Sequence, residues 1–251
     1  MGREGLRERA TIARSVLLWR SFLLEQVEPA AFYRVLAEDT VATVSAVAEL
    51  SGLTVADVGA GPGYFADAFG AAGARYVAID PDLGELTAAG APAPVTVRAS
   101  GLQLALKNDA VDVCMSSNVL EHVRSPGRMA AEMVRVTRPG GIVVISYTAW
   151  WGPWGGHETA PWHYLGGRFA ARRYQRRHGR PPKNRYGDSL FEASVSAGLR
   201  WARARRDVEV IAAFPRYHPA WLWWVVDVPV LQELASWNVC LVLRRSPGAG
   251  R

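Results

Sequence analysis

The sequence predicts an α/β fold, a Rossmann-like doubly wound sheet that is mostly parallel and has an antiparallel last strand. From residue 53 to residue 147, short apolar, β-branched runs alternate with helical stretches, as is typical of a parallel sheet with helices on both faces. The alternation then stops and resumes with a helix and two strands, 207–214 and 237–243. The short connection between these strands favours a hairpin, and therefore an antiparallel pair.

Each element follows from a local pattern. Two N-terminal helices are predicted over 12–27 and 30–50, because both stretches are rich in apolar residues and Pro29 restarts the chain between them. The strands of the alternating region are predicted at 53–58, 76–79, 95–97, 111–115 and 142–147, with helical stretches at 64–71, 84–89, 118–123 and 125–137. A turn at 138–141 starts the fifth strand. The last helix is predicted at 189–197, ended by Gly198.

Composition excludes several classes of protein. With 49% hydrophobic and 21% charged residues, the chain can bury a sizeable core, which excludes a disordered or disulfide-stapled protein. Cys114 and Cys240 lie in apolar runs and are predicted to be core residues, so nothing indicates an oxidising compartment. The longest apolar run, 219–231, is shorter than the roughly 20 residues that span a bilayer. The N-terminus lacks the order of a signal peptide. We therefore expect a cytoplasmic protein.

Charge and tryptophan are unevenly distributed. The formal net charge is +6, and between residues 149 and 206 twelve basic residues accompany only three acidic ones. Nine of the ten tryptophans lie after residue 149. The basic run at 168–183 is typical of a solvated helix face or of a site for phosphate or an anionic headgroup, and it fits nucleic acid less well. Trp221, Trp223 and Trp224 suit either a membrane interface or packing inside the protein or a dimer.

Three alternating glycines, Gly59, Gly61 and Gly63, stand between a predicted strand and a predicted helix. Glycine lets a ligand approach the backbone, and the helix N-terminus offers free N–H groups. The spacing departs from the G-x-G-x-x-G pattern of dinucleotide sites, which disfavours hydride transfer. Asp57 precedes the loop, and Asp80 ends the next strand, where a carboxylate can accept hydrogen bonds from ribose hydroxyls.

Four motifs together resemble the class I S-adenosylmethionine-dependent methyltransferases, within the group that has a methyltransferase-11-type domain. They are the D-x-G-x-G-x-G stretch at 57–63, Asp80, the Asn-Val-Leu-Glu-His-Val stretch at 118–123, and the Arg-Val-Thr-Arg-Pro-Gly-Gly-Ile stretch at 135–142. The resemblance covers roughly residues 50–148 well and the last strands loosely. It implies a single methyltransferase domain over 1–251. We divide it into N-terminal helices (1–50), a cofactor-binding core (51–148), an insertion or lid (149–188), and the final helix and strands (189–251) with a second aromatic insertion (215–236).

The resemblance implies S-adenosyl-L-methionine as the cofactor and a role for each matching residue. The loop would pass under the methionine part of the cofactor, Asp57 would order the loop or meet the amino group, and Asp80 would hold the ribose. Ser100 stands where the family usually has an acid that meets the adenine amino group, and a hydroxyl accepts that bond more weakly. The full set of expected cofactor-binding residues is Asp57, Gly59, Ala60, Gly61, Gly63, Asp80, Pro81, Ser100, Gly101, Leu102, Asn118 and Val119.

Three histidines are candidates for a catalytic base: His122, His157 and His163. His122 follows the fourth strand, at the edge of the sheet where ligands usually bind. The other two lie in the aromatic insertion that leaves the fifth strand. Each also has a structural interpretation as a hydrogen-bonded histidine, and Glu121 is expected to be solvated. A metal site at His157, Glu158, His163 and His122 is not predicted, because helical ligand spacing is absent and prolines interrupt the segment.

The leading hypothesis is methyl transfer to a hydroxyl of a small-molecule, lipid or glycolipid acceptor, by an enzyme that also associates with an anionic membrane surface on the inner face of the membrane. A nucleic-acid (RNA) methyltransferase is the second hypothesis. The segment after the fourth strand lacks the Asn/Asp-Pro-Pro-aromatic motif of nucleic-acid methyltransferases that modify amino groups. Neither cysteine lies in the Pro-Cys loop that cytosine-C5 methyltransferases need. The third is a non-catalytic scaffold that binds S-adenosylmethionine. Oligomeric state is left open.

Overall fold

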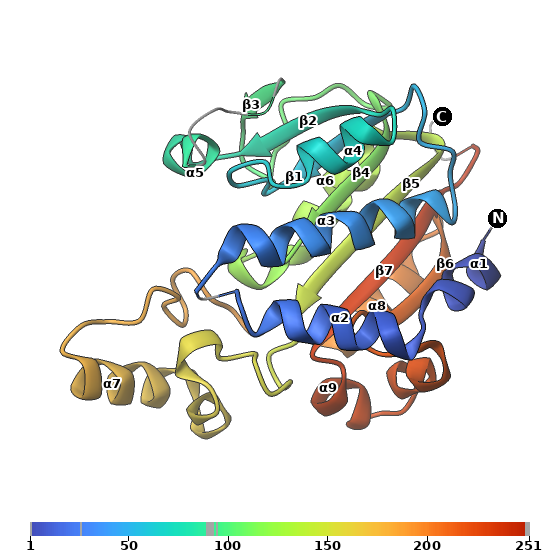
Figure 1. Cartoon of the computed structure of the whole chain (residues 1–251). Coiled ribbons are helices and arrows are strands. Elements are labelled where there is room, and N and C mark those ends of the chain that lie inside the picture. Colours follow the sequence, from blue (N-terminus) through green and yellow to red (C-terminus); the bar gives the residue numbers. More distant parts are fainter. Residues whose placement is uncertain (1, 26, 89–92, 94, 249–251) are drawn as a thin grey trace.

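The computed structural model describes residues 2–25, 27–88, 93 and 95–248 and contains one seven-stranded sheet (Figure 1). The strand order is β3-β2-β1-β4-β5-β7-β6. The strands are β1 Thr54–Val58, β2 Arg75–Asp80, β3 Thr96–Arg98, β4 Val111–Ser117, β5 Thr137–Thr148, β6 Val208–Pro215 and β7 Asn238–Arg245. The pairs among β1 to β5 are parallel, whereas β7 is antiparallel to both β5 and β6. The predicted fold class is confirmed.

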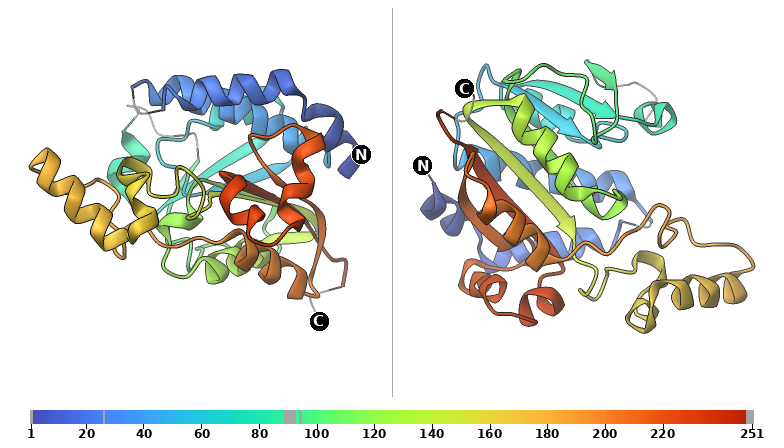
Figure 2. Two further views of the ribbon diagram at one scale, coloured as in Figure 1. Left: turned by 90° about the horizontal axis from the view of Figure 1, so that it is seen from below. Right: turned by 180° about the vertical axis from the view of Figure 1, so that it is seen from behind.

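Helices cover both faces of the sheet. They are α1 Arg3–Arg9, α2 Ile12–Phe22, α3 Pro29–Ser45, α4 Ala66–Ala71, α5 Leu83–Thr87, α6 Pro126–Val136, α7 Gly167–His178, α8 Val195–Ala204 and α9 Leu231–Ala235. On one face, Leu18, Phe32 and Phe69 from α2, α3 and α4 pack in one core cluster with strand residues. On the other face lie α6 and α8 (Figure 2, right). Met133 of α6 and Leu199 of α8 belong to a second core cluster. Apolar strands buried on both faces explain the continuous apolar runs in the sequence.

The last helix is the main error of the sequence-based assignment. It was predicted at 189–197 and ended by Gly198, but α8 spans Val195–Ala204, with Gly198 inside it. The Ser194 side chain caps the helix by accepting a hydrogen bond from the Ala197 N–H at 3.2 Å. A Cβ on Gly198 would collide with the Tyr147 hydroxyl, which donates to the Ser194 carbonyl at 2.9 Å. Gly198 therefore serves a close contact between helix and sheet.

Smaller differences occur at other elements. Helix α1 was not predicted, α2 ends at Phe22, α3 ends at Ser45, and the 118–123 stretch forms only the 3-10 turn η1, Leu120–His122. The predicted turn at 138–141 lies inside β5, where pairing with β4 shifts between Val111 and Val113. Residues 26 and 89, which fall in two predicted helices, lie outside the described residues.

The two insertions extend from the lower end of the sheet in Figure 1. The first carries α7 and two 3-10 turns, η2 His157–Thr159 and η3 Trp162–Leu165; the second carries the 3-10 helix η4 Ala220–Asp227 and α9. Both insertions follow strands β5 and β6 at their carboxyl ends. Among the described residues, no helix is long and apolar enough to cross a membrane. Cys114 and Cys240 are buried free thiols in the core.

Candidate active site

The glycine loop between β1 and α4 is fixed against the end of β2. The N–H groups of Gly59 and Ala60 both donate to the Ile79 carbonyl, at 2.7 and 3.1 Å. Gly59 has φ 81°, and a Cβ there would lie 2.5 Å from the Val119 side chain, so only glycine fits. A Cβ on Gly61 would meet no described heavy atom within 4 Å. The loop therefore leaves open space over Gly61, in which a cofactor can touch the backbone.

Asp80 is oriented toward this loop. Its carboxylate oxygens accept hydrogen bonds from the N–H groups of Gly61 at 3.1 Å and Asp82 at 2.9 Å. An ionised carboxylate has about four lone-pair positions, so Asp80 keeps capacity for the two hydroxyls of a ribose. Pro81 follows it and is exposed. The position and the spare acceptor capacity fit the role that the sequence predicts.

Asp57 is 2% exposed and lies beneath the loop. The Tyr76 hydroxyl donates to it at 2.5 Å. Burial raises the pKa of Asp57 to about 7, the Tyr76 hydrogen bond opposes this rise, and the charge of Asp80 adds to it. Because the buried carboxyl accepts from Tyr76 of β2, Asp57 joins the ends of β1 and β2 just before the loop.

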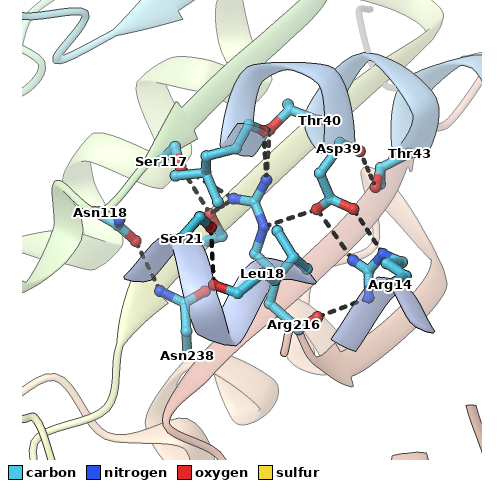
Figure 3. Close-up of polar contacts among 12 residues, drawn as sticks. Arg14, Leu18, Ser21, Asp39, Thr40, Thr43, Ser117, Asn118, Arg216 and Asn238 are labelled. Carbon is cyan, nitrogen blue, oxygen red and sulfur yellow. Dashed lines mark hydrogen bonds and ion pairs between the residues drawn. The ribbon is translucent and has the colours of Figure 1, made fainter. Parts of the chain in front are cut away.

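The remaining expected cofactor residues also lie at the carboxyl edge of the sheet. Ser100 is exposed, and its hydroxyl accepts a hydrogen bond from the Leu102 N–H at 3.2 Å, across the intervening Gly101. Asn118, with φ 58°, accepts a hydrogen bond from the Asn238 amide at 2.7 Å (Figure 3). Val119 covers Gly59. These contacts link the ends of β1, β4 and β7 around one site.

Next to Val119, three potential proton acceptors converge: Glu121, His122 and His157. Their ligating atoms all lie within 4.8 Å of one another, and the two imidazole centroids are 5.1 Å apart. Glu121 was expected to be solvated, but it is 1% exposed. Its Oε1 accepts from the Thr148 N–H at 3.0 Å, and its Oε2 has no hydrogen-bond partner among the described residues. The expectation fails because Glu121 turns inward under the end of β5.

The two histidines of this cluster present free nitrogen atoms. His122 Nδ1 is 2.7 Å from the Ser189 carbonyl oxygen, which can only accept, so Nδ1 donates this hydrogen bond and Nε2 is left for another contact. His157 Nε2 is buried and has no partner among the described residues. Burial lowers the pKa of His157, and nearby Glu121 opposes this change. Each ring therefore has a nitrogen available for a further contact at this cluster.

Glu25 interacts electrostatically with this cluster, and sequence reasoning missed it. It follows α2, and burial, followed by repulsion from Glu121, raises its pKa to about 7, while His122 and Lys183 oppose the rise. Neighbouring Tyr33 stacks on Tyr64 of the glycine loop, with centroids 5.0 Å apart and planes at 7°. No motif marks Glu25, because only the packing of α2 and α3 over the sheet brings it to the site.

The structure does not bring His163 or Glu158 into this cluster. His163 is fully buried, with Nε2 3.2 Å from the Gly152 carbonyl and its ring packed edge-on against Trp150. Glu158 accepts hydrogen bonds from the backbone and side-chain N–H groups of Asn184. These contacts favour the structural interpretation of both residues.

The sheet order, the glycine loop and Asp80 define a class: the class I S-adenosylmethionine-dependent methyltransferases. Residues 56–145 match the family model described as a methyltransferase domain. A Mycobacterium avium (strain 104) protein named as an uncharacterized methyltransferase is 54% identical over 246 residues, which cover 94% of this chain and 96% of the relative. The chain belongs to this family of methyltransferases, and its cofactor is S-adenosylmethionine.

Solved structures agree on the fold. The S-adenosylmethionine-dependent methyltransferase from Mesorhizobium loti superposes with a TM-score of 0.56 at 19% identity, over 85% of this chain and 98% of the other. The cyclase SpnF superposes with a TM-score of 0.53 at 16% identity, over 84% and 82%. Because a cyclase shares the architecture, the acceptor must be inferred from the site and not from the fold.

Asp80→Ala should weaken S-adenosylmethionine binding by at least one to two orders of magnitude, because loss of even one charge-assisted hydrogen bond costs about 1.5–3 kcal/mol. Calorimetry measures the affinity, and NAD should not bind. Asp82→Ala is the matched control, since Asp82 is an exposed acid that caps α5 by accepting from the Gly84 N–H at 2.7 Å. Unchanged affinity in the Asp80 variant would remove the ribose assignment.

Proposed function

We propose that this methyltransferase acts on a hydroxyl of a small, lipidic or glycolipid acceptor. The observation that carries the proposal is the cluster of Glu121, His122 and His157 beside the glycine loop. Methyl transfer from a sulfonium needs an aligned nucleophile, and a hydroxyl must also lose its proton. The attacking oxygen forms a bond to the methyl carbon, the carbon–sulfur bond breaks toward sulfur, and the proton leaves the hydroxyl. The free Nε2 atoms are suited to assist that proton loss.

The cluster also supports an enzyme over a non-catalytic scaffold. Glu121 Oε2 and His157 Nε2 are buried without hydrogen-bond partners among the described residues. Each such buried group costs about 1–3 kcal/mol of stability. A scaffold that only binds cofactor has no use for this arrangement, whereas an enzyme that handles a proton or a polar acceptor does.

Surface composition supports an amphipathic acceptor. Among the described residues, every large exposed apolar side chain except Leu83 and Val95 lies in three segments. These are α2 with the residues just after it, the first insertion around η3 and α7, and the second insertion around η4. Seen from below, both insertions face the viewer and α2 runs along one edge (Figure 2, left). This face surrounds the carboxyl edge of the sheet, where the site lies.

Basic side chains accompany these apolar ones. Helix α7 carries Arg172, Arg173, Arg176 and Arg177 around the exposed Phe169. Arg173 also lies 3.9 Å from the centroid of the Trp162 ring. Each basic group near an anionic lipid surface contributes about 1 kcal/mol, and tryptophan favours the membrane interface. We infer that the enzyme takes its acceptor at an anionic membrane surface.

Of the three tryptophans in the second insertion, Trp223 is 3% exposed and stacks on Phe214, whereas Trp221 and Trp224 are 63% and 52% exposed. The packing interpretation therefore holds for Trp223, and only its two neighbours are available to a membrane.

Co-sedimentation with vesicles tests this surface. The protein should bind vesicles that contain anionic lipid, bind less as salt increases, and bind more weakly when Trp221 and Trp224 are both replaced by serine, because these side chains lie at the surface. A matched control replaces the exposed Leu83 and Val95, which lie outside the three segments, by serine. If the wild type stays in the supernatant at low salt, the membrane proposal is wrong.

The acceptor class is tested with isotopically labelled S-adenosylmethionine and a total lipid extract. Labelled products should gain the mass of one methylene, and prior acetylation of the hydroxyls in the extract should abolish labelling. Labelling of nucleic acid, or lipid products methylated at carbon or nitrogen, would contradict the proposal.

A further inference from the structure

We propose that Glu121, His122 and His157 form a binding site for a divalent transition-metal ion of the zinc or manganese type. Two imidazole nitrogens and one carboxylate oxygen are a ligand set that proteins use for catalytic ions, with open positions left for substrate. The binding of the ion stands on this geometry alone. Its use in the reaction rests on the proposed function. With the ion bound, the histidine nitrogens are ligands and not proton acceptors, so an acceptor hydroxyl in an open position would have its pKa lowered and would release its proton to solvent.

The distances and free lone pairs match such a site. The three ligating atoms lie within 4.8 Å of one another. Zinc bonds of about 2.0–2.2 Å in tetrahedral geometry place ligand atoms about 3.4 Å apart, so the three side chains would draw together around a bound ion. Glu121 Oε2 and His157 Nε2 are both buried and lack hydrogen-bond partners among the described residues, which an ion between them would supply.

The hydrogen bonds that the other atoms of these side chains make to the backbone are also typical of metal ligands. A ligating histidine usually donates its second N–H to a carbonyl, which fixes the tautomer and the ring orientation. His122 does so, with Nδ1 2.7 Å from the Ser189 carbonyl. Glu121 is held through its other oxygen by the Thr148 N–H at 3.0 Å. In each case one atom is anchored to the backbone and the other is directed into the cluster.

The backbone at His157 supports a functional role. His157 has φ 48°, a left-handed conformation that is uncommon for a residue other than glycine. Its N–H donates to the Trp154 carbonyl at 2.8 Å, which holds the tight turn that presents the ring to His122. Strained backbone of this kind concentrates at functional sites.

The local charge favours a cation. Glu25 lies close enough to Glu121 for the two carboxylates to repel each other. A divalent ion beside Glu121 would offset this repulsion. The sequence does not predict a metal, because helical ligand spacing is absent and prolines interrupt the segment, and the set that it offers contains Glu158 and His163 instead of Glu121. In the structure, Glu158 and His163 lie outside the cluster, and the buried Glu121 lies in it.

The test measures metal binding without cofactor or acceptor. Untagged protein freed of metal with a chelator should bind one Zn²⁺ or Mn²⁺ per chain in calorimetry, and the ion should raise the temperature of unfolding. Glu121→Gln and His157→Gln should each weaken binding by more than the roughly 10–100-fold caused by loss of an outer contact. Glu158→Gln and His178→Gln are the controls and should bind as the wild type does. Circular dichroism of the metal-free variants checks that they are folded.

Absence of binding by folded wild-type protein, or equal binding by the Glu121 and His157 variants, would overturn the proposal. Full methyl transfer in the presence of chelator, with turnover lost only on replacement of the histidines, would overturn the use of the ion in the reaction. That last result would not affect the proposal that the acceptor is a hydroxyl. Metal binding without any hydroxyl methylation would instead keep the metal site and reject the proposed acceptor.

Discussion

His157→Ala should lower turnover on a hydroxyl acceptor by roughly 10²–10⁴-fold while leaving S-adenosylmethionine affinity nearly unchanged. The reason is that Nε2 of this residue is buried without a partner among the described residues, whereas we expect the cofactor contacts to come from the glycine loop and Asp80. Without His157, the site lacks either a group that assists the departure of the hydroxyl proton or a ligand that positions the acceptor. Either change accounts for a decrease of this size. Labelled methyl transfer measures turnover, and calorimetry measures cofactor affinity.

His122→Ala should behave similarly, because its free Nε2 faces the same cluster. His163→Ala should instead reduce stability more than turnover, since its ring is packed against Trp150. His178→Ala, at the exposed end of α7, is the control and should change neither. Near-normal rates in the variants of both His122 and His157 would mean that neither residue assists the acceptor. Alignment of the acceptor with the methyl group would then account for the rate.

Arg216→Met should destabilise the protein by about 3–5 kcal/mol, because loss of one partner of a buried ion pair leaves the others unpaired. Arg216 is 3% exposed and connects β6 to α3 and to the ends of β4 and β5 (Figure 3). Its Nε contacts Asp39 at 3.2 Å, Nη1 donates to Ser117 and Ser146 at 3.0 and 2.9 Å, and Nη2 donates to the Leu36 carbonyl at 3.2 Å. Arg14 also pairs with Asp39, at 2.6 Å, so we expect the lower end of the range.

Urea unfolding measures this loss, with Arg203→Met as the matched control. Arg203 pairs with Asp227 at 3.1 Å in an exposed position, and such pairs contribute at most about 1 kcal/mol. If the Arg216 variant is no less stable than this control, the buried network does not stabilise the fold. Arg216 also holds Ser117, which directly precedes Asn118, one of the expected cofactor-binding residues. We therefore expect weaker cofactor binding in the Arg216 variant as well.

Local patterns predicted what depends on short stretches of chain. The strands β1, β2, β4 and β5 are marked by apolar runs, and the glycine loop is marked by residues that neighbour one another in sequence. Parallel strands bring their carboxyl ends to one edge, so Asp80 and Asn118 could be placed near the loop before any contact was known. Within the α/β class, the family and the cofactor follow from the same motifs.

Predictions failed where a contact joins distant segments. In sequence, Gly198 looks like the end of a helix. In the structure, the absence of a side chain there leaves room for the hydroxyl of Tyr147, which comes from β5. Glu121 resembles a surface residue of a helix, but the end of β5 buries it. Neither neighbour is close in sequence, so no local propensity could reveal these contacts.

The sequence by itself determined the sheet, the glycine loop, the cofactor and the candidate histidines, because periodicity and motif spacing are local properties of the chain. Only the tertiary structure decided that His122 and His157 meet while His163 does not, that Glu121 and Glu25 join them, and that Arg216 is buried among three elements. These groups come from segments far apart in the chain. Their side chains meet because helices and insertions are packed at one edge of the sheet, and that packing depends on the whole core.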